Sequence, residues 1–215
     1  MCGRFSLTSK IEHVIEQLNI INAIELAPSY NIAPTQDIAV VRLYNERFEI
    51  SKMRWGLIPF WMKEKPKTNN LINARAETVS SKPSFRNAYT KRRCLIPANG
   101  FYEWQKSASG KQPYYIERKD KHVFTFAGLW EHWELGGESI DSCTIITTAA
   151  NNEMQSIHQR MPVIINSDQY DTWFHAEDPA SLLSPYPSGI LNLYPVSSHV
   201  NSPTHNDERC IEKLS

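Results

Sequence analysis

The sequence predicts an α+β fold: a mainly antiparallel, barrel-like β-sheet core with peripheral helices. Apolar runs of strand length outnumber helical patterns, and each run is bounded by Gly, Pro, Asn or Asp. The connections between the runs are short. The chain has 215 residues, 41% of them hydrophobic, and no Gly/Ser-rich or charge-rich linker divides it. We therefore expect a single domain over residues 1–215.

The chain is expected to begin with one amphipathic helix. Apolar residues recur at helical spacing within residues 9–18, and Ser9 with Glu12 forms a capping-box pattern at its start. A Pro-rich loop follows at residues 27–36.

A hairpin is expected next. Residues 37–44 and 48–55 are predicted to be strands joined by a tight turn at Asn45-Glu46. Residues 56–70 are predicted to form a long loop with exposed aromatic side chains.

The middle of the chain alternates a helix with several strands. Pro83 is a favoured first helical residue, so a helix is predicted from there toward the basic residues 91–93. Four further strands are predicted, at residues 94–104, 113–118, 122–130 and 142–149.

Short helices dominate the last part of the chain. They are predicted at residues 151–157 and 167–174, with a strand at 161–165 between them. Another short helix is predicted to be capped by Asp178, with Pro179 at its start.

Charge and targeting signals narrow the class of protein. Lys+Arg and Asp+Glu both number 23, so any binding of nucleic acid must depend on a local basic patch. No apolar run approaches membrane-spanning length, and residues 1–10 lack the apolar stretch of a secretory signal. We therefore expect an intracellular, monomeric protein that does not contact a membrane.

The four cysteines are scattered, at Cys2, Cys94, Cys143 and Cys210. No pair has the spacing of a zinc knuckle or a redox motif, so we expect reduced thiols, no metal site and no cofactor. Cys94 and Cys143 lie in apolar strands and are expected in the core.

Cys2 is the first candidate for chemistry. Initiator methionine is usually trimmed when the next side chain is small, and trimming would leave Cys2 with a free α-amine beside its thiol. Such a 1,2-aminothiol exists only at the start of a chain. Gly3 would let another molecule approach the backbone closely. The alternative is that Cys2 is merely a small residue near a terminus.

Three polar residues are further candidates. His158 lies where a helical pattern meets a buried strand, a junction that exposes side chains on a rigid frame. Glu103 lies among aromatic residues on the strand face shared with Phe101, where desolvation would raise its pKa as a general acid requires. Asn73 opens the segment NARAET. The alternatives are a structural histidine, a solvated glutamate on an edge strand and a polar turn.

Cationic and aromatic residues suggest the ligand. Arg4, Arg75 and Arg160 each lie within two residues of a candidate catalytic group. The segment 55–61 adds Trp55, Phe60 and Trp61. Because arginine binds phosphate and exposed aromatic rings stack on unpaired bases, this set favours a single-stranded nucleic acid.

Taken together, these segments resemble the SOS response-associated peptidase family, whose domain is called SRAP. The matching stretches follow the family's order from Cys2 to about Ile165 and return weakly at residues 192–201. They are MCGRF, YNIAPT, WGLIPFW, INARAET, CLIPANGFYEW, AGLWE, IITTAAN and IHQRMPVII. The resemblance implies one SRAP domain over residues 1–215.

The resemblance also implies a function in the DNA damage response. In this family the cysteine after the initiator methionine crosslinks to abasic sites in single-stranded DNA, and that position is Cys2. The implied product is a protective thiazolidine DNA–protein crosslink. It is made inside the cell and, if the protein is bacterial, in the cytoplasm near the nucleoid. The implied enzyme activities are autocatalytic removal of Met1 and lyase-like chemistry on abasic DNA. A general protease is not expected.

Individual residues acquire roles by their place in the family's motifs. The implied catalytic residues are Cys2, Asn73, Glu103 and His158. The implied DNA contacts are Arg4, Asn31, Pro34, Trp61, Arg75 and Arg160. The partner is single-stranded DNA that contains an abasic site.

Two other functions stay open on the sequence. An N-terminal cysteine followed by glycine also begins glutaminase-type amidohydrolases, in which the thiol attacks an amide and the α-amine acts as base. Arg4 and the aromatic segment 55–61 fit nucleic acid better than glutamine. The second alternative is a module that binds single-stranded DNA without covalent chemistry.

Overall fold

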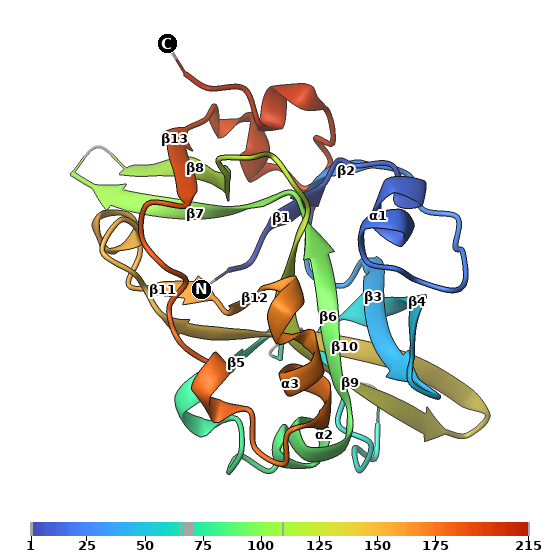
Figure 1. The fold of residues 1–215 in the computed structure, drawn as a ribbon. Helices are drawn as coiled ribbons and strands as arrows, with labels where there is room; N and C mark the ends of the chain where they lie inside the picture. The colour runs from blue at the N-terminus through green and yellow to red at the C-terminus, as the bar shows by residue number, and fades with distance from the viewer. Residues whose placement is uncertain (1, 65, 67–70, 109, 215) are drawn as a thin grey trace.

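The computed structural model describes residues 2–64, 66, 71–108 and 110–214, and its strands form two sheets (Figure 1). The smaller sheet contains β1 (Phe5–Leu7), β2 (Ser29–Ile32), β7 (Gly100–Ser107), β8 (Gly110–Arg118) and β13 (Leu191–Pro195). Their order across the sheet is β13-β8-β7-β1-β2, and every neighbouring pair is antiparallel.

The larger sheet closes on itself. Its strands are β3 (Asp37–Tyr44), β4 (Arg47–Trp55), β5 (Asn73–Arg75), β6 (Arg93–Ala98), β9 (Phe124–Leu135), β10 (Glu138–Ala149), β11 (Arg160–Pro162) and β12 (Ile164–Ile165). β10 pairs with β4, β4 with β3, β3 with β6, β6 with β9, and β9 again with β10. This ring confirms the predicted barrel-like, mainly antiparallel core. β4 and β5 run parallel to β10, which the sequence pattern did not predict.

The helices are short and lie outside the sheets, as predicted (Figure 1). The α-helices are α1 (Ile11–Gln17), α2 (Arg86–Lys91) and α3 (Tyr170–His175). The 3₁₀ helices are η1 (Ala76–Thr78), η2 (Met154–Ser156), η3 (Ser167–Gln169), η4 (Ala180–Leu182), η5 (Ser198–Asn201) and η6 (Glu208–Cys210). Among the described residues, no helix has both the length and the apolar character needed to cross a membrane.

The hairpin formed by β3 and β4 confirms its prediction. The turn residues Asn45 and Glu46 have φ values of 46° and 59°. Two consecutive positive φ angles make a turn whose twist matches that of the flanking strands.

The predicted capping box at α1 is wrong, because Ser9 bonds to a distant residue instead. The backbone N–H of Ser9 donates to Oδ1 of Asn99 at 2.9 Å, and Nδ2 of Asn99 donates to the Ser9 hydroxyl at 2.9 Å. The N-cap of α1 is Lys10, with no side-chain capping bond. Asn99 thereby fixes the chain just after β1.

Several predicted boundaries also shift, and the predicted loop 27–36 contains the strand β2. The helix near Pro83 begins only at Arg86, since turns occupy the residues between them. The predicted strand 94–104 is divided at Asn99, so that β6 belongs to the larger sheet and β7 to the smaller. The predicted strand 161–165 is divided at Val163, and its halves β11 and β12 pair with β10 and β9.

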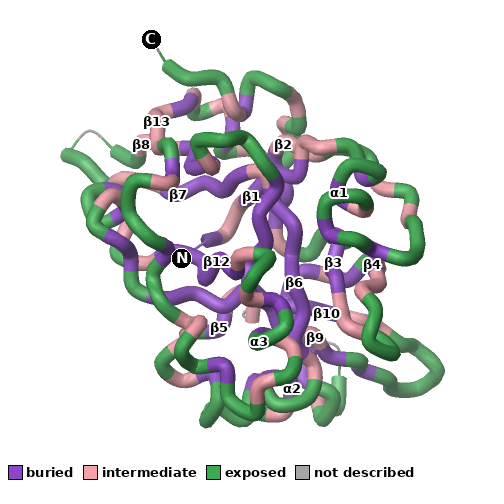
Figure 2. Tube along the Cα trace, viewed as in Figure 1, coloured by how far each residue is buried: buried purple, intermediate pink, exposed green. Residues whose placement is uncertain are grey.

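The main core fills the barrel and extends to β1. Figure 2 shows buried positions along β1 and β6 and exposed positions in the surrounding loops. Phe5 on β1 makes edge contacts with Trp55 and Phe126, at ring-centroid distances of 5.2 and 5.8 Å. These contacts hold β1, a strand of the smaller sheet, against the larger sheet. Cys94 and Cys143 are fully buried, as predicted, and all four cysteines are free thiols.

Candidate active site and nucleic-acid interface

Cys2 lies at the inner end of the segment that leads into β1. Its side chain is completely buried. Its backbone oxygen accepts a hydrogen bond of 2.7 Å from Nδ2 of Asn73 on β5. β5 is held by its parallel pairing with β10, where Asn73 lies opposite Ile145. The structure therefore joins Cys2 and Asn73, which are far apart in the sequence.

The side-chain oxygen of Asn73 is a second polar atom at this site. This oxygen, Oδ1, is buried and has no hydrogen-bond partner among the described residues. A buried acceptor without a donor is costly, and such atoms occur where a ligand or reacting group completes the site. Oδ1 can therefore accept an N–H from a group that enters beside Cys2.

Glu103 lies on β7, which pairs with β1. Its neighbours Tyr102 and Trp104 pack in a separate cluster on the opposite face of the strand, whereas Phe101 belongs to the main core with Cys2. Alternation therefore turns Glu103 toward the side of Cys2 and Phe101. Only 3% of Glu103 is exposed, and this burial raises the pKa of its carboxyl group.

The same buried surroundings change the pKa of the Cys2 thiol. Burial raises its pKa, and the negative charge of Glu103 raises it further. Cys2 is therefore a neutral thiol at neutral pH, without the thiolate character of a cysteine-protease nucleophile. It requires a proton acceptor at the moment when its sulfur forms a bond.

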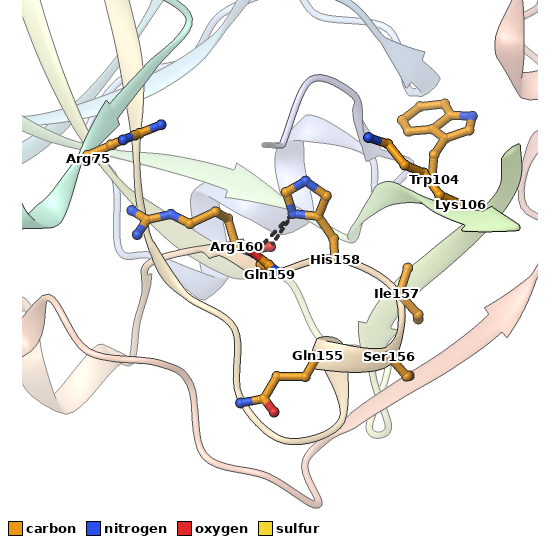
Figure 3. Close-up of a pocket in the computed structure, with 9 residues that line it drawn as sticks. All are labelled: Arg75, Trp104, Lys106, Gln155, Ser156, Ile157, His158, Gln159 and Arg160. Carbon is orange, nitrogen blue, oxygen red and sulfur yellow. Dashed lines mark hydrogen bonds between the residues drawn. The ribbon is translucent and has the colours of Figure 1, made fainter.

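His158 lies at the rim of this site and is 31% exposed. Its Nδ1 is 3.9 Å from Oε1 of Glu103. The same nitrogen lies 3.0 Å from the backbone N–H of Arg160 and 3.1 Å from the backbone oxygen of Arg160 (Figure 3). A neutral Nδ1 accepts from that N–H, and a protonated Nδ1 donates to that oxygen. Both protonation states are therefore satisfied in one ring position, which suits a proton shuttle.

A cationic groove of about 530 Å³ adjoins His158 (Figure 3). Its lining residues are Arg75, Trp104, Lys106, Gln155, Ser156, Ile157, His158, Gln159 and Arg160. Three of these described residues are cations, and none of them is acidic. Arg75 is exposed at the end of β5, and Trp104 offers an aromatic ring. This combination suits a phosphate backbone with unpaired bases.

Sequence reasoning missed Trp104 and Lys106. They share one face of β7, opposite to that of Glu103, because residues two apart on a strand point the same way. The alternation that turns Glu103 inward thus also predicts these two side chains, and it was available in the sequence.

Arg4 and Asn31 lie apart from this groove and bond to each other. Nη1 of Arg4 donates to Oδ1 of Asn31 at 2.7 Å and to the backbone oxygen of Val200 at 2.9 Å. Burial lowers the pKa of Arg4. Nδ2 of Asn31 lies within 3.2 Å of the backbone oxygens of Val200, Ser202 and His205. Asn31 is almost fully buried, so its side chain holds Arg4 and the C-terminal loop together.

Pro34 and Trp61 do not line the groove. Pro34 is half-buried in the loop between β2 and β3, next to Thr35, whose φ is 78°. Trp61 is 50% exposed, as is its neighbour Phe60 at 51%. The loop that carries them is held by a bond of 2.9 Å from Nε1 of Trp133 to the backbone oxygen of Met62.

A second polar cluster lies in the C-terminal loop. Ligand atoms of His199, Asp207 and Cys210 lie within 4.8 Å of one another. The carboxylate of Asp207 is already paired with His199 at 3.1 Å and with Arg209 at 2.9 Å. These contacts account for the cluster as part of the packing of this loop.

Comparison with known proteins places the chain in a family. Residues 1–203 match the family model described as SOS response associated peptidase (SRAP). The chain is 44% identical to the Bacillus subtilis abasic site processing protein YoqW over 99% of both chains. It is 33% identical to the Gallus gallus abasic site processing protein HMCES, over 86% of this chain and 66% of that one.

Solved structures agree with these matches. A protein from Bacteroides thetaiotaomicron superimposes with a TM-score of 0.90 at 28% identity and 100% coverage of both chains. One from Bordetella bronchiseptica gives a TM-score of 0.79 at 28% identity, over 91% of this chain and 100% of that one. With its barrel-like core and the site around Cys2, and on the family model and the relatives it matches, the chain belongs to the SOS response associated peptidase (SRAP) family.

Proposed function

We propose that this protein senses abasic sites in single-stranded DNA and bonds to them covalently through Cys2 once Met1 has been removed. The observation that carries the proposal is the placement of Cys2. Its backbone oxygen is held by Asn73, and the charge of Glu103 acts on its thiol. His158, 3.9 Å from Glu103, links this site to the cationic groove that it lines. The curated relatives named as abasic site processing proteins support the same substrate.

The reaction balances without a cofactor. An opened abasic deoxyribose carries an aldehyde, and a free α-amine has a pKa of about 7.7–8.0, so part of it is neutral at pH 7. The amine of Cys2 condenses with the aldehyde to an imine and releases one water. The thiol then adds to the imine carbon, and its proton passes to the nitrogen. The product is a thiazolidine ring, which forms only where amine and thiol belong to one residue.

Three neighbouring side chains meet the proton demands of these steps. Glu103, with its raised pKa, donates a proton to the ring oxygen of the sugar during opening. His158, at the rim, carries protons during imine formation and its reversal. Oδ1 of Asn73, which has no partner within the described part of the chain, accepts a hydrogen bond from the α-amine and orients it.

The groove supplies the DNA contacts in this proposal. Arg75, Lys106 and Arg160 bind phosphates, and Trp104 stacks on a base. Arg4, which lies just before β1 and close to Cys2 in the chain, is a further DNA contact, and Asn31 holds its side chain in place. Direct contacts by Asn31, Pro34 and Trp61 stay predictions, as do the monomeric state and the cellular compartment.

The enzyme activity proposed has two parts. The first is autocatalytic removal of Met1, which lies outside the described residues. The second is the covalent chemistry on abasic DNA. A neutral Cys2 thiol argues against a general cysteine protease, because such enzymes require a low thiol pKa.

Intact mass spectrometry tests the proposal. Purified protein is incubated with a single-stranded oligonucleotide that contains one abasic site. We expect loss of Met1, followed by a mass equal to protein plus oligonucleotide minus one water. A boil-stable product must be absent when the abasic site is replaced by an ordinary nucleotide.

Two outcomes of these assays would contradict the proposal, and each would indicate a different function. Binding without any covalent product would indicate a non-covalent single-strand module. Release of ammonia from glutamine, with no DNA adduct, would indicate the glutaminase-type amidohydrolase.

A further inference from the structure

The guanidinium of Arg160 is already occupied by a carboxylate. Nη1 and Nη2 of Arg160 donate to the two carboxylate oxygens of Glu77, the second at 3.0 Å. This two-point arrangement is the one by which arginine recognises phosphate. A phosphate therefore cannot take the same edge of Arg160 while Glu77 remains there.

The position of Arg160 does not depend on Glu77 alone. Nη2 of Arg160 also donates to the backbone oxygen of Thr147 at 2.6 Å. Thr147 lies on β10 and is paired with the strand that Arg160 begins, β11. This rigid backbone contact keeps the guanidinium at the groove when the carboxylate leaves.

Glu77 lies at the surface of the protein. It lies in the one-turn helix η1, and its side chain is 54% exposed. Among the described residues, the groove is lined by the cations Arg75, Lys106 and Arg160 and by no acidic residue. Glu77 thus places a negative charge beside a surface that otherwise attracts phosphate.

We propose that Glu77 is a built-in competitor for phosphate: its carboxylate occupies Arg160 in the free protein and gives way to a backbone phosphate of the bound strand. This inference rests on the proposed function. Because breaking an exposed ion pair opposes binding, Glu77 weakens the affinity for DNA by about two- to fivefold. A polyanion that also engages Arg75 and Lys106 overcomes this cost more readily than a single small anion.

The test measures non-covalent affinity by fluorescence anisotropy. The probe is a single-stranded oligonucleotide with a tetrahydrofuran abasic analogue, which has no aldehyde and cannot crosslink. Wild type, Glu77→Gln, Arg160→Gln and the double variant form a double-mutant cycle. We expect Glu77→Gln to bind about two- to fivefold tighter and to have no effect in the Arg160→Gln background.

A control separates this effect from a general change of charge. Glu134, on β9, is an exposed carboxylate that does not line the groove, with a side chain 70% exposed. Glu134→Gln should leave the affinity within about 1.5-fold of wild type at 0.15 M salt, where distant charges are screened. Melting temperatures of all variants confirm that they are folded.

Each other outcome overturns the inference. Weaker binding by Glu77→Gln would make Glu77 a positioning residue for Arg160. Equal tightening with and without Arg160 would make it a general electrostatic effect. Wild type is tested in parallel on an aldehydic abasic strand. If it crosslinks while Glu77→Gln binds no tighter, only the role of Glu77 is wrong, whereas a wild type that neither binds nor crosslinks overturns the proposed function as well.

Discussion

The replacement Glu103→Gln tests the proposed chemistry most directly. Glutamine has nearly the shape of glutamate but cannot donate an acidic proton. Burial raises the pKa of Glu103, so its carboxyl group destabilises the fold when it ionises, at pH values above the ordinary glutamate pKa. Glu103→Gln should therefore be at least as stable as wild type at pH 7, and a loss of rate could not be attributed to unfolding.

Burial also increases the fraction of Glu103 that is protonated at pH 7. An ordinary glutamate, with a pKa of about 4.3, is protonated in only about one molecule in 500 at pH 7. Each unit by which burial raises that pKa increases the protonated fraction about tenfold until it saturates. Loss of a general acid should slow crosslinking by about 10²–10⁴-fold if ring opening is limiting.

The pH profile provides the sharper test. The free α-amine becomes neutral as pH rises, which speeds imine formation, whereas protonated Glu103 is lost as pH rises through its folded pKa. Wild type should therefore show a bell-shaped rate profile, and Glu103→Gln should retain only the rising limb. The assay is a time course of boil-stable adduct on one abasic oligonucleotide between about pH 5 and 9.

Glu117→Gln is the matched control. Glu117 is also buried in the smaller sheet, but it lies on β8 and pairs with Lys121. Its replacement should leave the bell shape intact. A falling limb that persists in Glu103→Gln, or a rate within about threefold of wild type, would refute the role of Glu103 as general acid.

Three further predictions test the neighbouring residues. Cys2→Ala, which keeps the amine, should lose the stable crosslink yet be trapped by borohydride as a reduced imine; a boil-stable adduct without reductant would contradict thiazolidine formation. His158→Ala should slow both formation and reversal of the crosslink, by about 10²–10⁴-fold where proton transfer limits the rate, as followed by a chase with unlabelled strand. Asn31→Ala removes a charge-assisted bond from Arg4 and the contacts to the C-terminal loop, so unfolding in denaturant should show a loss of about 3 kcal/mol; a loss below about 1 kcal/mol would mean that this network is not structural.

The sequence alone was sufficient for the fold class and for much of the local structure. Alternating and apolar runs predicted most of the strands, and the Asn45-Glu46 turn was recognisable because it lies between two such runs. The motif order also identified the family. Boundaries were less certain where a side chain bonded far along the chain, as Ser9 does with Asn99.

Only the tertiary structure decided how the candidate residues meet. The parallel pairing of β5 with β10 brings Asn73 to Cys2, and such long-range pairing leaves no periodic trace in the sequence. The different surroundings of two arginines were likewise decided only by the tertiary structure. Arg75 is exposed at the groove, whereas Arg4 is bonded to Asn31, and composition cannot distinguish them. Residue identity thus determined which chemistry was available, whereas burial and contacts between distant strands decided which atoms could carry it out, because pKa, reach and charge all depend on neighbours that the chain brings together only on folding.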